Sequence, residues 1–247
     1  MPSRTPRSSD SPKQKPRRAS GRPFADATVG RDIILDATVL LLKSRTPEQL
    51  SISEIALAAG VTRALVRYYF SDLRGLLGEV TERLMGELQD RMGKALQMRG
   101  TVTERVHQRL LLRLEFMREH PHFERLALSE IYHSGSGDAM PDSESPLKRT
   151  TRRGLELTSL LLNDSPASTV DPRFVHLAIL SVSAFLPNAQ PLLVELFGHG
   201  AKAERKINEY LWFVSALLAD RIEQGDPPDG AAPSPAGKKT AQRTASR

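Results

Sequence analysis

The sequence contains no cysteine, has a single tryptophan among few aromatic residues, and lacks any long apolar run. Without cysteine the chain has no disulfide framework, no thiolate metal site and no cysteine nucleophile. No apolar run approaches the ~18 residues that cross a bilayer, and no apolar segment follows the basic N-terminus as in a secretory signal. We therefore expect a cytoplasmic protein with no membrane partner.

Motifs that would indicate catalysis are also missing. There is no Ser/His/Asp arrangement, glycine-rich phosphate loop or HExxH, so we predict no enzyme activity, no catalytic residues and no cofactor. His120, His122 and His133, with glutamates nearby, are possible zinc ligands. Pro121 lies between His120 and His122 and gives their side chains poorly controlled directions for binding a metal. The simpler interpretation is that the two histidines lie at the start of a helix. We predict no metal site.

The net charge of +6 combines two basic ends, which carry +6 and +2, with a middle of the chain that carries −2. Residues 1–23 carry seven Lys or Arg against one acid, Asp10, and residues 225–247 carry four against two. Few apolar residues accompany these charges, which predicts a disordered basic arm (1–25) and a disordered tail (225–247). The arm either follows a DNA minor groove or only solubilises the protein.

The stretch from Ser51 to Phe70 predicts two short helices joined by a glycine turn. Ser51 and Glu54 have the spacing of a capping box. Gly60 tolerates the left-handed conformation that ends a helix, and Thr62 is a suitable N-cap for the next one.

The second of these helices has two unlike faces. Val66 and Phe70, four residues apart, predict the buried face, while the opposite face is basic and polar. Two helices meeting at a tight turn, the second with a basic outer face, have the shape that enters a DNA major groove. The alternative is an ordinary solvated helix face.

The stretch resembles the helix-turn-helix of the tetracycline-repressor (TetR) family of bacterial transcription regulators. The resemblance covers about residues 30–77 and rests on three segments: Ile33 to Thr38, Ala59-Gly60-Val61-Thr62 with Phe70, and Leu76-Leu77. Three positions depart from the family pattern. Arg67 stands where a tyrosine is usual, Leu73 where a lysine is usual, and Leu65 where a small polar residue is usual.

The resemblance implies an all-α fold with a helix-turn-helix DNA-binding domain (26–77) and a helical ligand-binding and dimerisation domain (78–224). It implies a nucleoid-associated, ligand-responsive repressor that binds a pseudo-palindromic double-stranded DNA operator as a homodimer and responds to an unidentified small-molecule effector. Two alternatives remain open. One is a DNA-binding regulator without an effector, controlled by a protein partner, and the other is an architectural protein that binds mainly through its tails.

Helical periodicity continues along the chain. The pattern over 30–44 predicts an inward face made of Ile33, Ala37, Leu40 and Leu41. A long fourth helix should continue to about Arg99 and end at Gly100. A loop is expected over 133–146. The segments 174–186 and 207–222 are apolar nearly all round, which predicts burial on both sides, partly by a second subunit.

These patterns yield two sets of candidate residues. Base contacts are expected from Arg63 and Arg67, phosphate contacts from Thr62, Tyr68 and Tyr69, and the full predicted DNA-binding set is Thr62, Arg63, Ala64, Arg67, Tyr68, Tyr69 and Arg74. The large side chains of the C-terminal half either line an effector pocket or form core and dimer interface; they are Phe116, Met117, Phe123, Tyr132, Phe185 and Trp212.

Overall fold

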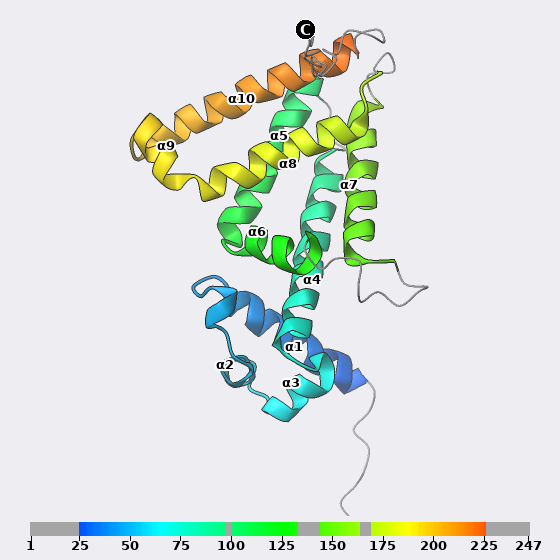
Figure 1. The fold of residues 1–247 in the computed structure, drawn as a ribbon, viewed down its shortest axis with the longest axis vertical. Coiled ribbons are helices and arrows are strands. Elements are labelled where there is room, and N and C mark those ends of the chain that lie inside the picture. The colour runs from blue at the N-terminus through cyan, green and yellow to red at the C-terminus, as the bar shows by residue number, and fades with distance from the viewer. Residues whose placement is uncertain (1–24, 97–99, 133–143, 164–168, 226–247) are drawn as a thin grey trace, which may run out of the picture.

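A computed structural model of the chain describes residues 25–96, 100–132, 144–163 and 169–225, and every regular element in these ranges is a helix (Figure 1). The all-α prediction is confirmed for this part of the chain. Nearly all of the predicted basic arm and of the predicted tail, and most of the loop 133–146, lie outside the described residues.

The first helices gather at the lower end of the molecule, and a long helix runs from them toward the other end (Figure 1). They are α1 (Ala25–Leu41), the short 3-10 helix η1 (Pro47–Gln49), α2 (Ile52–Ala58), α3 (Arg63–Phe70) and the connecting helix α4 (Leu73–Ala95). α4 ends earlier than predicted, with Leu96 as its C-cap.

The inward face predicted for α1 is wrong at two positions. Ile33 and Leu40 are exposed, and the helix instead buries Ile34, Leu35 and Thr38. Apolar residues occur on several sides of α1, so its own periodicity does not select one face. The choice is made by packing against α2, α3 and α4.

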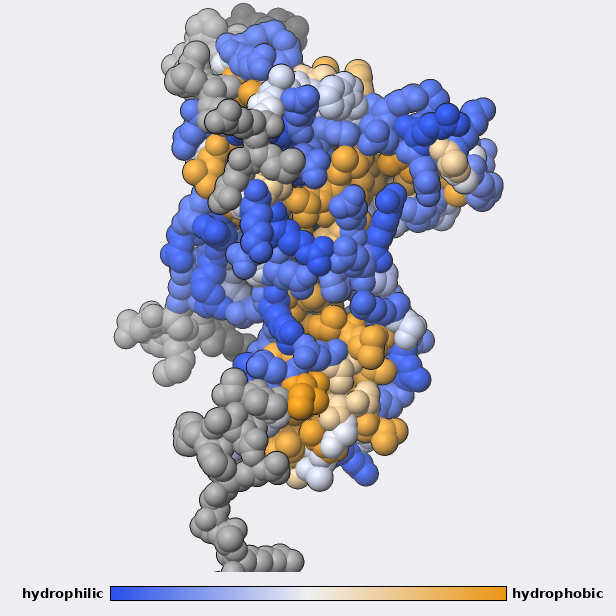
Figure 2. All heavy atoms as spheres, turned by 180° about the vertical axis from the view of Figure 1, so that it is seen from behind, coloured by the Kyte–Doolittle hydropathy of each residue, from blue (hydrophilic) through white to orange (hydrophobic). Residues whose placement is uncertain are grey.

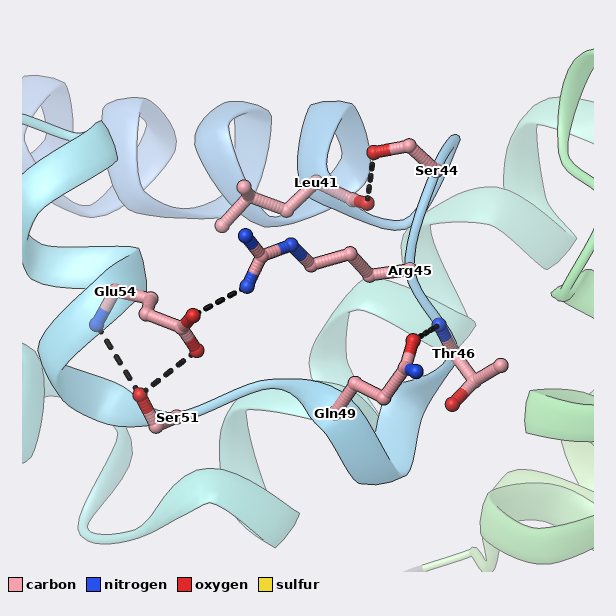
Figure 3. A network of polar contacts seen from close by, with 7 residues as sticks. All are labelled: Leu41, Ser44, Arg45, Thr46, Gln49, Ser51 and Glu54. Atoms are coloured by element: carbon pink, nitrogen blue, oxygen red, sulfur yellow. Dashed lines mark hydrogen bonds and ion pairs between the residues drawn. The ribbon is translucent and has the colours of Figure 1, made fainter.

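The start of α2 is fixed by side-chain contacts that Figure 3 shows in detail. Ser51 Oγ accepts the backbone N–H of Glu54 at 3.3 Å and donates to Glu54 Oε2 at 2.9 Å. The other carboxylate oxygen accepts from the Arg45 guanidinium. The hydroxyl first, and then Arg45, lower the pKa of the Glu54 carboxyl. The N-cap half of the predicted capping box is therefore confirmed, and the carboxylate also ties α2 to the loop after α1.

Gly60 has a positive φ of 66°, as the predicted turn requires. We expect Gly60→Ala to destabilise the protein by about 1–2 kcal/mol, because an L side chain is strained in the left-handed region. Gly86→Ala is the matched control. It lies inside α4, where an added Cβ meets nothing within 4 Å, so it should stabilise by about 0.5–1 kcal/mol through helix propensity. Urea denaturation measures the free energy of unfolding of both variants. Equal changes in the two would contradict the explanation by the positive φ of Gly60.

The C-terminal helices form the other end of the molecule. They are α5 (Val102–Glu119), α6 (Phe123–Leu126), the π-helical η2 (Ala127–Tyr132), α7 (Pro146–Leu162), α8 (Pro172–Asn188), α9 (Gln190–Phe197) and α10 (Ala201–Gln224). α7 lies beside α4, while α8 and α10 both cross α5 and are joined by α9 at one side (Figure 1).

Two hydrophobic cores hold these helices together. The first contains the inner side chains of α1 to α4 and continues along α4 to Phe116, Phe123 and Ile131. The second lies among α5, α7, α8, α9 and α10. Because the first core runs from the helix-turn-helix into α6 and η2, these two short elements contact the N-terminal bundle. The predicted domain bounds at 77 and 224 stay a prediction.

No single helix in the described ranges has the length and apolar character to cross a membrane. Only α8 and α9 taken together pass that test of length and composition, with a bend of 83° between them.

Candidate nucleic-acid interface and ligand pocket

The outer face of α3 is open to solvent, and the packing beneath it fixes its direction. Val66 and Phe70 are buried in the first core. Thr62 caps the helix by accepting the backbone N–H of Leu65 at 3.2 Å. The exposed residues on and just before α3 are Thr62, Arg63, Ala64, Arg67 and Tyr68. This cap and these two anchors therefore hold a basic, polar helix face outward.

The other two predicted contacts have different surroundings. Tyr69 is half-buried, with its hydroxyl 3.4 Å from where a Cβ on Gly30 would stand. Arg74 is exposed at the start of α4, with its Nε 3.9 Å from Glu130 Oε2 on η2. The structure thus places Tyr69 against α1 and Arg74 near η2.

A cavity of about 370 Å³ lies in the C-terminal half, between α4, α5, η2, α7 and α8. Its wall is mainly apolar, with side chains such as Leu88, Met92 and Ile179. The polar residues in the wall are Gln89, Arg109, Arg113, Tyr132, Thr150, Thr151, Arg173 and His176. An apolar cavity with a few convergent polar groups is the usual form of a small-molecule site.

Of the predicted pocket residues, only Tyr132 lines this cavity. Phe116 and Phe123 are fully buried in the first core, with ring centroids 5.1 Å apart. Met117 lines a smaller cavity beside α8 and α9.

Phe185 and Trp212 are more than 45% exposed. Trp212 lies against His107, with ring centroids 5.0 Å apart. The structure therefore does not bring the predicted residues together, because most of them pack in a core or lie on the surface.

Sequence reasoning missed a row of buried arginines. Arg105, Arg109 and Arg113 are spaced four apart on α5 and are at most 7% exposed. They lie next to the buried apolar stripe of this helix (Val106, Leu110, Leu114 and Met117). The spacing is visible in the sequence, but arginine is rarely buried, so such a row is normally interpreted as a solvated face.

Each of these arginines has a specific partner. Arg105 donates to the Leu161 carbonyl at 2.7 Å, and Arg113 forms an ion pair with Glu124 at 3.0 Å. Arg109 donates through Nη2 to Thr158 Oγ1 at 3.0 Å. Burial, followed by the charge of Arg113, lowers the pKa of Arg109 to about 10. Arg109 therefore stays charged at neutral pH.

His176 on α8 lies beside these arginines. Burial first, and then the charges of Arg109 and Arg113, lower the pKa of His176 to about 4, so the ring is neutral near pH 7. Gly154 on α7 makes room for it, since a Cβ there would lie 2.5 Å from His176 Cε1. The positive charge in the cavity wall therefore comes from arginine.

In the described part of the chain, no three His, Asp or Glu side chains meet as a metal site would require. His133, one of the three histidines considered as ligands, lies outside the described residues.

Comparison with known proteins gives a family match for the N-terminal bundle. Residues 34–80 match the family model described as bacterial regulatory proteins of the tetR family. No curated protein matches the chain significantly.

Solved structures give a match over most of the chain. FadR, a fatty acid degradation regulator from Bacillus halodurans, is 18% identical, with 76% of this chain and 94% of FadR covered and a TM-score of 0.51. FadR from Bacillus subtilis, solved in complex with stearoyl-CoA, is 14% identical, with 79% and 99% covered and a TM-score of 0.53. A putative TetR-family transcriptional regulator from Rhodococcus sp. is 18% identical, with 77% and 99% covered and a TM-score of 0.56.

Residues 34–80 therefore match the DNA-binding domain of the tetR family of bacterial regulatory proteins, and the chain as a whole has a fold similar to that of solved TetR-family regulators.

Proposed function

We propose that this protein is a transcriptional repressor that binds a pseudo-palindromic operator as a homodimer and is released by a small-molecule effector. The observation that carries the proposal is the outward face of α3. Its exposed arginines and hydroxyl groups stand on a helix anchored by Val66 and Phe70. A helix of this kind enters the major groove, and a dimer presents two of them to successive grooves.

Within this interface we assign base contacts to Arg63 and Arg67, because a guanidinium can donate to O6 and N7 of guanine. Thr62 and Tyr68 are assigned to phosphates, and Ala64 leaves space for close approach. Tyr69 and Arg74 remain in the proposed set, with Tyr69 able to reach a phosphate only through its hydroxyl end.

Arg67→Ala should weaken binding to the operator by about 1–3 kcal/mol and change binding to unrelated DNA little, because one base contact is lost. The operator is first selected from random duplexes with the full chain, and affinities are then measured by fluorescence anisotropy at fixed salt. Arg205→Ala, an exposed arginine on α10, is the control and should change neither affinity. Equal losses on both DNAs would reassign Arg67 to the backbone, and a selection that returns no preferred sequence would contradict the proposed function.

The homodimer is supported by apolar side chains left exposed on α8 and α10. The stripe on α8 includes Phe174, Leu177 and Phe185, and that on α10 includes Tyr210, Phe213 and Leu217. From behind, apolar residues gather in the upper, C-terminal half of the molecule, with polar residues on either side of them (Figure 2). Large apolar side chains that gather on an exposed face indicate a protein interface.

The effector site is assigned to the cavity of about 370 Å³. FadR from Bacillus subtilis has a similar fold and was solved with stearoyl-CoA, which supports a small ligand for this fold. The cavity also favours a ligand-responsive regulator over the alternative of control by a protein partner alone, since a filled core would leave no room for an effector.

Two paths lead from the cavity to the DNA-binding helices. α4 contributes Leu88 and Met92 to the cavity wall, and its other end follows α3 directly. α6 carries Glu124, the partner of Arg113, together with Arg125, which pairs with Glu48 of η1 at 3.0 Å. An effector that prefers one position of α4 and α6 would change the spacing of the two recognition helices, and operator affinity would fall.

A further inference from the structure

Arg109 is a buried charge whose hydrogen bonding is incomplete. Its side chain lines the cavity while the residue is only 4% exposed. Nη2 donates to Thr158, but Nε and Nη1 have no hydrogen-bond partner among the described residues. A guanidinium cannot escape this penalty by losing its proton at neutral pH, and a buried charge without partners is strongly unfavourable. The free donors of Arg109 therefore indicate an acceptor that the described residues do not supply.

The charge around Arg109 is not balanced by the protein. Arg113 is paired with Glu124, and Arg173 at the edge of the cavity is paired with Asp171. No described residue in the cavity wall is acidic, and no ion pair to Arg109 is present in the described ranges. One positive charge thus remains without a counter-ion, which matches a ligand carrying one negative charge.

Thr158, the hydrogen-bond partner of Arg109, cannot supply the missing acceptor. The Thr158 hydroxyl already accepts from Arg109 and donates to the Gly154 carbonyl at 2.9 Å, with His176 Nδ1 at 3.2 Å. The surface of the cavity wall as a whole is largely hydrocarbon, contributed mainly by α4, α7 and α8. An anion bound here must therefore carry an apolar body.

We propose that this cavity binds a compact amphipathic carboxylate, whose carboxylate accepts hydrogen bonds from Arg109 and whose apolar body lies against Leu88, Met92, Leu157 and Ile179. The volume of about 370 Å³ is near the lower end for ligand sites, which favours a small acid over a large conjugate. This inference rests on the proposed function, because it names the class of effector that the regulator recognises.

The first test compares two ligands on the unaltered protein. Decanoate and 1-decanol have the same chain and differ in their charged head. Isothermal titration calorimetry of the full chain at neutral pH, without DNA, should show decanoate binding about tenfold or more tightly, because a charged hydrogen bond replaces a neutral one. Equal affinities, tighter binding of the alcohol, or no binding of decanoate would overturn the inference.

The second test removes the charge. Arg109→Met should weaken decanoate binding by about tenfold or more and leave 1-decanol binding unchanged or slightly tighter. Arg105→Met is the matched control, since Arg105 is buried in the same row of α5 but does not line the cavity. This control should keep the preference for the acid. Circular dichroism verifies that each variant folds, and retention of the preference in Arg109→Met would contradict the assignment of Arg109.

The experiments distinguish failure of the carboxylate-binding proposal from failure of the proposed regulatory function. Operator selection uses ligand-free protein, so a chain that selects an operator but binds neither ligand is a DNA-binding regulator whose cavity has another role. A chain that binds decanoate through Arg109 and selects no DNA sequence contradicts the regulator while leaving the anion site in place.

Discussion

Glu124→Ala is expected to lower the free energy of unfolding by about 3–5 kcal/mol, because it leaves the buried Arg113 without its counter-ion. The side chains of Arg113 and Glu124 are 3% and 12% exposed, and the two groups meet at 3.0 Å. Without the carboxylate, the buried Arg113 would face only the like charge of Arg109. Urea denaturation at neutral pH measures the loss.

Two controls separate this effect from ordinary loss of a surface charge. Glu82→Ala removes the partner of Arg149 from an ion pair in which both side chains are more than 40% exposed, and it should change stability by less than about 1 kcal/mol. Adding Arg113→Met to Glu124→Ala should restore most of the stability, because the uncompensated charge is gone. If the double variant is as unstable as Glu124→Ala alone, the loss comes from packing of α6 and not from charge.

Phe213→Glu is expected to convert the proposed homodimer to a monomer and to weaken binding to the proposed operator by about 100-fold. Phe213 is 58% exposed in the single chain, in the stripe of α10 assigned to the interface. A dimer would bury the new carboxylate of each subunit without a partner, which opposes association. Each recognition helix would then bind its half-site independently, without the gain from linking two sites. Analytical ultracentrifugation and fluorescence anisotropy measure the two effects.

The matched control is Leu40→Glu, another exposed apolar residue changed to the same charge, on α1 and outside the proposed interface. It should stay dimeric. Circular dichroism should show unchanged helicity in both variants, since both positions are exposed. A Phe213→Glu protein that remains dimeric would place the interface elsewhere.

Much of the proposed DNA-binding surface was predictable because its signals are local. The caps Ser51 and Thr62 lie within three residues of the N–H groups they accept, and Gly60 provides its turn by its own conformation. Val66 and Phe70 lie four apart and so face the same way on any helix. These relations hold over a few residues and need no knowledge of the rest of the fold.

The sequence by itself therefore determined the helices, the turn of the helix-turn-helix and the outward basic face of α3. Only the tertiary structure decided which face of α1 is buried and where the cavity lies. Arg109 is buried beside Thr158 of α7, which lies 49 positions further along the chain. Arg113 is buried beside Glu124, which lies on α6. A side chain's burial depends on partners distant in the sequence, and helical periodicity does not contain that information.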